Sequence, residues 1–214
     1  MGNAVLSVSF CLLALLAQGC AVGNRYNFTG SIPELNLSGP RESAVAVATL
    51  DRRTTVVTGE SAPTYVGMQR GGFGNVFRVD TESGLPFADD VTRAVSDSLA
   101  RKGFSATPVY VTFDKTEAAV VQELLARNSR RSLFLQVNRW ESDTYANIGL
   151  EYDLRLKVMD VDRNVLASAS TAGKETIPGS AWNPPAAAME QIPIAFKRVL
   201  ETLLNDPKVL DALK

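Results

Sequence analysis

One segment of strict alternation limits the fold of this chain more than any other feature of its sequence. In GLEYDLRLKVM, residues 149–159, apolar and charged side chains take turns. The apolar positions are Leu150, Tyr152, Leu154, Leu156 and Val158, and the charged ones are Glu151, Asp153, Arg155 and Lys157. A period of two is that of a β-strand, so the pattern predicts a strand with one buried and one solvated face. Such a strand requires a sheet that packs on one side against other elements.

Other β-prone segments supply the rest of that sheet. Four of them predict strands: SAVAVATL (43–50), TPVYVTF (107–113), SLFLQVNRW (132–140) and VLASAST (165–171). The turn DVDRN, residues 160–164, joins the alternating strand to the last of these and completes an antiparallel meander. Between residues 56 and 79, short β-prone pieces separated by glycines predict a hairpin or a long loop.

Three longer segments show helical spacing. Phe87, Val91, Ala94, Val95 and Leu99 form one apolar stripe, with Gly103 placed to cap its end. A second helix follows the 107–113 strand, with Asp114 as the expected cap. A third runs from about 185 to 205 with a kink at Pro193, and a short terminal helix starts at Asp206-Pro207.

The order of elements defines the expected fold class. It reads strand, insert, helix, strand, helix, three strands, helix, which is the pattern of an α+β domain. We expect a single mixed β-sheet with about three helices packed mainly on one face. This domain should occupy residues 43–214.

The N-terminus has the pattern of an export signal. Residues 4–17 are uncharged and mostly apolar, and at this length they are too short to cross a bilayer, which takes roughly 20 residues. Ala17 and Gly19 are the small residues expected before a cleavage site. Residues 1–19 are therefore predicted to be a signal peptide whose removal leaves Cys20 as the first residue.

The sequence LLAQGC, residues 15–20, resembles the lipobox of bacterial lipoproteins, in which a cysteine is acylated and becomes the mature N-terminus. The resemblance implies lipid attachment at Cys20. Cys11 leaves with the signal, so Cys20 would otherwise be an unpaired exported thiol. Ala21 follows the cysteine in place of Asp, which implies an outer-membrane location with the domain facing the periplasm. An ordinary secretory signal cut before Cys20 also fits.

Residues 20–42 read as a lipidated N-terminus and tether, because glycines and prolines interrupt them and they show little periodicity. The sequence leaves open whether the tether docks partly on the domain.

Composition excludes several kinds of chemistry. The chain has 22 basic and 23 acidic residues and no histidine, and its two cysteines both lie within the first twenty residues. The balanced charge argues against a nucleic-acid partner. Histidine-dependent nucleophilic pairs and zinc sites cannot be built from the mature chain. We expect no catalysis, no cofactor and no metal.

Two longer stretches carry a family resemblance. YVGMQRGGFGNVFRV (65–79) and LPFADDVTRAVSDSLARKGF (85–104), with the closing strand-strand-helix, resemble the YajG-type family of small periplasmic lipoproteins over roughly residues 43–204. That family implies no established activity. A fainter similarity of layout to the N-terminal domain of TolB and to lipoprotein activators of cell-wall synthases suggests domains that bind proteins at the envelope.

Three motifs have residue types that could support binding or chemistry. RGGFGNV, residues 70–76, lacks the Lys-Ser/Thr of a P-loop and is typical of a turn, with Arg70, Gly71, Gly72 and Gly74 as possible ligand or partner contacts. The 160–164 turn has the first calcium-loop spacings but lacks the required glycine and glutamate. Asp89 and Asp90 are adjacent on a helix and point apart, which favours compensation of the helix dipole.

These observations lead to three functional hypotheses. The first is an outer-membrane lipoprotein whose periplasmic domain binds or scaffolds another envelope component. The second is a small-ligand-binding or hydrolytic envelope protein that uses the glycine-rich insert, which a deep pocket with convergent carboxylates beneath residues 67–79 would favour. The third is a subunit of a lipid-anchored envelope assembly. The partner and the oligomeric state stay open.

Overall fold

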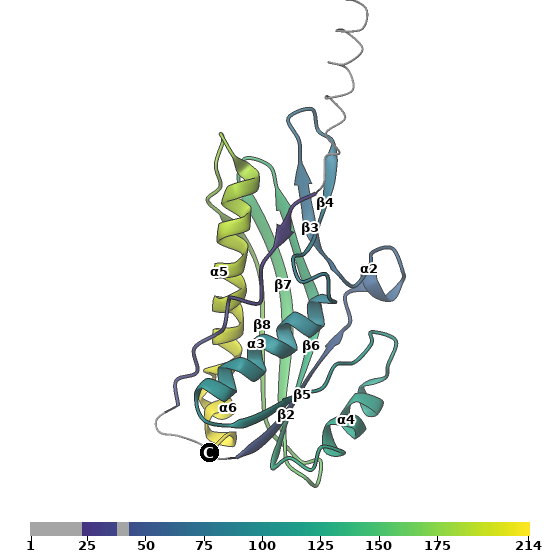
Figure 1. Cartoon of the computed structure of the whole chain (residues 1–214), viewed down its shortest axis with the longest axis vertical. Coiled ribbons are helices and arrows are strands. Elements are labelled where there is room, and N and C mark those ends of the chain that lie inside the picture. Colours follow the sequence, from purple (N-terminus) through teal and green to yellow (C-terminus); the bar gives the residue numbers. More distant parts are fainter. Residues whose placement is uncertain (1–22, 38–42) are drawn as a thin grey trace, which may run out of the picture.

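The long strand β6 (Arg131–Thr144) is the spine of the sheet (Figure 1). One side of β6 pairs antiparallel with β7 (Ile148–Met159), which pairs antiparallel with β8 (Val165–Ile177). The other side pairs in parallel with β2 (Ala44–Asp51) and, further along, with β3 (Tyr65–Arg70). The computed structural model describes residues 23–37 and 43–214, in which this sheet has eight strands.

Three short strands extend the sheet outward from β2 and β3. Strand β5 (Ser105–Pro108) pairs in parallel with β2. Strand β4 (Val76–Thr81) pairs antiparallel with β3 and completes a hairpin, and β1 (Arg25–Tyr26) pairs in parallel with β4. The hairpin therefore continues the line of β2 along the same side of β6.

The described residues form five helices, and helices pack on both faces of the sheet. Alternate residues of β2 show this, because Val45 and Val47 belong to one apolar core while Ala46 and Ala48 belong to another. The larger core contains side chains of α3 (Phe87–Arg101), α5 (Pro184–Leu204) and α6 (Pro207–Ala212). The smaller core lies under α4 (Glu117–Leu125), and α2 (Thr54–Val57) is a single turn between β2 and β3.

The predicted α+β class with one mixed sheet is confirmed, as is the alternating strand, now β7. The helix count and order differ from the prediction, because the insert contains α2 as well as the β3–β4 hairpin, and α4 lies on the opposite face from α3 and α5. The predicted 107–113 strand is wrong beyond Pro108. There the chain leaves the sheet to place Val109 and Val111 in the smaller core.

The cap of α4 is also corrected. The sequence predicted Asp114, but the structure places Thr116 at the N-cap, where its hydroxyl accepts a hydrogen bond from the Ala119 amide at 3.2 Å. Thr116 satisfies the same kind of exposed helix amide as an aspartate would, from a position two residues later.

The segment read as a tether is partly built into the domain. Residues 23–37 run along the sheet to α5, and their apolar side chains are almost fully buried: Tyr26, Phe28, Leu35 and Leu37. The Phe28 ring lies 5.1 Å from Phe87, 6.1 Å from Trp140 and 4.7 Å from Phe196, measured between ring centroids. Phe28 is thus at the centre of an aromatic cluster that joins the N-terminal segment to α3, β6 and α5.

Phe28→Ala should lower the free energy of unfolding by about 3–5 kcal/mol, because it opens a cavity at the centre of the cluster. Phe73→Ala is the matched control, since Phe73 is 101% exposed, and it should change stability by less than about 0.5 kcal/mol. Urea denaturation of the two variants checks this. Equal stabilities would mean that residues 23–37 add nothing to the core.

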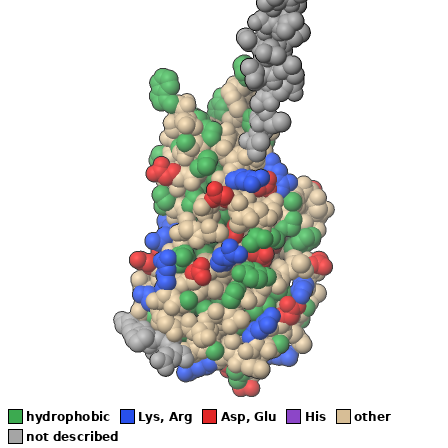
Figure 2. Space-filling view, viewed as in Figure 1, with side chains coloured by type: hydrophobic (Ala, Val, Ile, Leu, Met, Phe, Trp, Pro, Cys, Tyr) green, Lys and Arg blue, Asp and Glu red, His purple; other side chains and the backbone are tan. Residues whose placement is uncertain are grey.

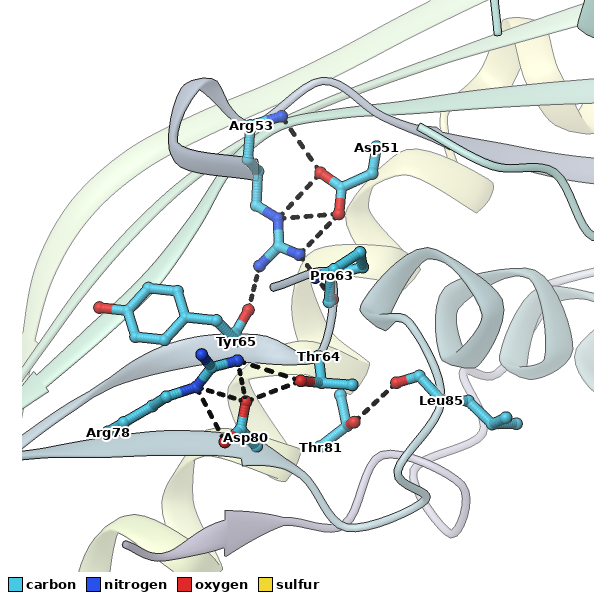
Figure 3. Close-up of polar contacts among 9 residues, drawn as sticks. All are labelled: Asp51, Arg53, Pro63, Thr64, Tyr65, Arg78, Asp80, Thr81 and Leu85. Carbon is cyan, nitrogen blue, oxygen red and sulfur yellow. Dashed lines mark hydrogen bonds and ion pairs between the residues drawn. The ribbon is translucent and has the colours of Figure 1, made fainter. Parts of the chain in front are cut away.

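A buried ion pair holds the base of the hairpin (Figure 3). Arg53 and Asp51 are 4% and 3% exposed in their side chains, and Arg53 Nη2 lies 2.6 Å from Asp51 Oδ2. The guanidinium also donates to the Pro63 carbonyl at 3.0 Å and to the Tyr65 carbonyl, and it lies over the Phe87 ring. The end of β2 is thereby joined to the start of β3 and to α3.

Arg53→Met should destabilise the fold by about 3–5 kcal/mol, because the Asp51 carboxylate stays buried without a cation. Adding Asp51→Asn to that variant should recover part of the loss, although the two carbonyls stay without their donor in both variants. Thermal denaturation compares the single and double variants. A double variant less stable than Arg53→Met would contradict the ion-pair explanation.

Candidate functional site

The glycine-rich segment forms the turn of the β3–β4 hairpin. The Gly71 amide donates to the Asn75 carbonyl at 2.8 Å, and the Gly74 amide donates to the Gly71 carbonyl at 2.9 Å. Gly74 has a φ of 81°, which suits glycine at the end of such a turn. These amides are used within the turn, so this geometry does not make a phosphate cradle. Gly72 borders a hollow at the same end of the molecule, and any ligand or partner contact by these glycines stays a prediction.

The Arg70 side chain extends from the β3–β4 hairpin toward β6. Its Nη2 lies 2.6 Å from Asp143 Oδ2, and its Nε donates to Asp143 Oδ1 at 2.9 Å. This pairing is bidentate and exposed, and it raises the pKa of Arg70. Arg70 is therefore neutralised locally and joins the hairpin to the spine of the sheet.

A hollow of about 520 Å³ opens beside this pair on the face of the sheet away from α5. Its charged lining residues come from β3, β6, β7 and β8: Arg70, Glu141, Asp143, Glu151, Lys174 and Glu175. Glu175 only borders the hollow, because its side chain pairs with Arg198 of α5 on the opposite face of the sheet. Helix α4 packs on the same face further along, where Glu117 pairs with Lys157. Among the described elements, none covers the part of the face that contains the hollow.

Most of the charged groups in the hollow have partners. Glu151 Oε1 lies 2.6 Å from Lys174 Nζ, and its other oxygen accepts from Arg139. These two cations hold the pKa of Glu151 below its ordinary value. The Tyr65 hydroxyl donates to Glu141 Oε1 at 2.9 Å, and burial together with this carboxylate raises the pKa of Tyr65.

This arrangement suits recognition better than proton transfer. Glu151 stays ionised and Tyr65 stays protonated near neutral pH, so neither is poised to exchange a proton there. The fixed alternation of acids and bases can match a partner of complementary charge pattern. In the described part of the chain, no group of three His, Cys, Asp or Glu residues is placed to hold a metal ion.

The sequence singled out Arg70 of this hollow but missed Glu141, Asp143 and Lys174 as its neighbours. Their signal was present in the alternation of charges along two adjacent segments, RWESD in β6 and the 149–159 strand. Register was the missing information, because it is the pairing of Glu141 with Glu151 across β6 and β7 that brings the charges together.

The other acidic candidates lie elsewhere. Asp160 accepts a hydrogen bond from the Asn164 side-chain amide at 2.9 Å, which is the main cause of its lowered pKa, and its other oxygen accepts from the Asn164 and Asp162 backbone amides in the β7–β8 turn. Asp90 is 1% exposed in the first turn of α3. Its Oδ2 accepts from Ser83 at 2.8 Å, while its Oδ1 has no hydrogen-bond partner among the described residues.

Comparison with known proteins assigns no family to this chain. No family model matches the chain, and no curated protein is similar to it. Among solved structures, protein XCC0632 from Xanthomonas campestris, assigned to the family model DUF330, is 17% identical with a TM-score of 0.46, over 84% of this chain and 90% of that one.

Two further solved structures are similar in part. A PelC dodecamer from Paraburkholderia phytofirmans is 14% identical with a TM-score of 0.40, over 79% of this chain and 96% of that one. Lipoprotein GNA1162 from Neisseria meningitidis is 13% identical with a TM-score of 0.30, over 74% and 99%. Likenesses this distant assign no function, and the resemblance to the YajG-type family stays a prediction.

The predicted lipid site, Cys20, lies outside the described residues, as does the signal peptide. Within residues 23–37 and 43–214, no helix is both long enough and apolar enough to span a bilayer.

The buried carboxyl group of Asp90 makes the stability of the fold depend on pH. Burial raises the pKa of Asp90 to about 6, so the folded protein binds a proton that the unfolded chain releases near its ordinary value. The free energy of unfolding should therefore fall as the pH rises from about 4 to about 6. Asp90→Asn should show a smaller fall, because burial also raises the pKa of the adjacent Asp89, and it should be more stable than wild type at pH 7.5 by ~1–2 kcal/mol.

Urea denaturation at several pH values between 4 and 8 measures the difference. Asp211→Asn, at an exposed carboxylate, is the matched control and should follow the wild-type curve. A wild-type curve parallel to that of Asp90→Asn across the range would contradict the assignment.

Proposed function

We propose that this chain is an outer-membrane lipoprotein, anchored through Cys20, whose periplasmic domain binds another envelope protein. The observation that carries the binding role is the uncovered hollow on the β6–β7–β8 face, where charged groups are held in fixed pairs. The lipobox-like LLAQGC supports the anchor. Catalysis is not part of the proposal, because most carboxylates of the hollow are committed to cations or to Tyr65.

A second candidate is recognition of a small polar ligand in the same hollow. Its volume of about 520 Å³ is within the range of small-molecule sites and favours this alternative. A charge-patterned hollow that is open along one side suits a protein surface as well. Whether a protein crosslinks to the hollow distinguishes a protein partner from a small ligand.

The anchor is tested by metabolic labelling with a palmitate analogue. Wild-type protein should carry the label, and Cys20→Ser should lose it, because the thiol is the acceptor of the acyl group. Ser7→Ala, elsewhere in the same segment, is the control and should stay labelled. A wild-type protein labelled no more than Cys20→Ser would refute the anchor.

The binding face is tested by replacing Lys174 with a photoreactive phenylalanine analogue in intact cells. Lys174 is 81% exposed in its side chain at the rim of the hollow, and Met189 on α5 provides an exposed control position. Light should join one protein to position 174 and not to position 189.

A charge reversal sharpens that experiment. Glu151→Arg should abolish the adduct at position 174, because it breaks the remaining pair with Arg139 and reverses a charge in the hollow, whereas Glu190→Arg on α5 should leave it intact. An adduct unaffected by Glu151→Arg, or no adduct above background, would refute the protein-binding role of this face.

A further inference from the structure

Three turns at one end of the molecule carry exposed aromatic rings. Phe73 lies in the β3–β4 turn, Tyr145 in the β6–β7 turn and Trp182 between β8 and α5. Phe73 is 101% exposed, Trp182 98% and Tyr145 56%. The rings of Phe73 and Trp182 thus contact almost nothing in their own chain, and Tyr145 is about half buried, although burying all three would be favourable.

The three turns belong to one surface, which we name the aromatic pole: residues 71–75, 145–147 and 178–183. A hollow of about 410 Å³ is lined by Gly71 and Gly72 of the first turn, Tyr145 and Ala146 of the second and Ala181 of the third. Figure 1 shows the hairpin turn and the start of α5 together at the upper tip of the long axis.

The aromatic pole contains no charged residue, although 21% of the whole chain is charged. The turns at the other end differ: residues 160–164 read DVDRN and residues 126–130 read ARNSR. In Figure 2, hydrophobic and uncharged atoms occupy the upper projections, and the blue and red side chains lie lower down. The turns of the aromatic pole are therefore uncharged, and the charged residue that lines its hollow, Arg70, is paired with Asp143.

The start of the described chain points to what covers the aromatic pole. Gly23 packs directly on β4, where a Cβ would lie 1.7 Å from the Arg78 carbonyl oxygen. Strand β1 then runs parallel to β4, away from the pole. Cys20 lies three positions before Gly23 along the chain, a span of at most ~11 Å. Strand β4 covers a similar length, ~10 Å, from Arg78 back to Asn75 in the hairpin turn.

We propose that the aromatic pole docks on the bilayer that holds the Cys20 acyl chains, with Phe73, Tyr145 and Trp182 in the headgroup region. This inference rests on the proposed lipid anchor. The short reach from Gly23 keeps the anchor beside the pole, and aromatic rings on uncharged turns suit the membrane–water interface. The long axis then stands away from the membrane, and the charged end faces the periplasm.

The two tryptophans make the docking measurable. Trp182 is 98% exposed at the pole, whereas Trp140 is 1% exposed inside the core. Full-length protein, processed in cells, is reconstituted into phosphatidylethanolamine–phosphatidylglycerol vesicles that contain an acyl-brominated phospholipid. The bromine should quench most of the emission that wild type has and Trp182→Phe lacks, and it should leave the Trp140 emission unchanged.

The matched control puts a tryptophan at the far end. Val161, 60% exposed in the β7–β8 turn, is replaced in the Trp182→Phe background to give Val161→Trp. That emission should be quenched by aqueous acrylamide and not by the brominated lipid. Equal bromine quenching at positions 161 and 182 would overturn the proposed orientation.

Mass spectrometry of the same preparation separates this inference from the anchor. An acylated Cys20 with Trp182 still open to acrylamide refutes the docking and leaves the anchor standing. Trp182 protected from acrylamide but not quenched by bromine also refutes the docking, because a protein surface would then cover the pole. Bromine quenching without acylation supports the docking and refutes the anchor.

Discussion

Burial of Phe28 among Phe87, Trp140 and Phe196 is the packing interaction on which the rest of this structure depends. It turns the segment after the predicted lipid site from a spacer into part of the core. A free coil of about twenty residues would have a typical end-to-end distance of roughly 25 Å, so the domain could lie anywhere within that distance of its lipid anchor. With Gly23 packed on β4, the domain has one attachment point and a defined end beside it.

The pairing of β6 then sets the working surface. Strands β2 and β3 pair with the same side of β6, and the buried Asp51–Arg53 pair holds the segment that connects them. Strand β3 then places Arg70 beside Asp143 of β6. Because β7 pairs with β6 over its full length, the charged positions of the two strands meet in register. Helix α4 covers only part of this face, so these charges border a hollow that the described elements leave open.

Local chemistry predicted the periodic elements well. The alternation of residues 149–159, the stripe and cap of α3 and the Asp206-Pro207 start of α6 all follow from short-range rules, and all are present. Tertiary context decided the exceptions. Val109 and Val111 look like a strand but pack under α4, and Tyr26 and Phe28 lie in an aperiodic segment whose burial depends on helices more than 50 residues away. The residues that line the hollow could not be predicted for a related reason, since strand register cannot be read from one segment.

The anchor, the aromatic pole and the hollow constrain one another. Arg70 and Tyr145 border both the hollow of the charged face and the hollow at the pole, so the two surfaces are adjacent. If the pole rests on the bilayer, the charged face opens sideways just above the headgroups, since the sheet runs along the long axis. A partner bound there would lie close to the membrane, which restricts it to membrane proteins and to other proteins held at the same surface. Rigid attachment through Phe28 makes that geometry possible, because a flexible tether would not hold the face at a fixed height.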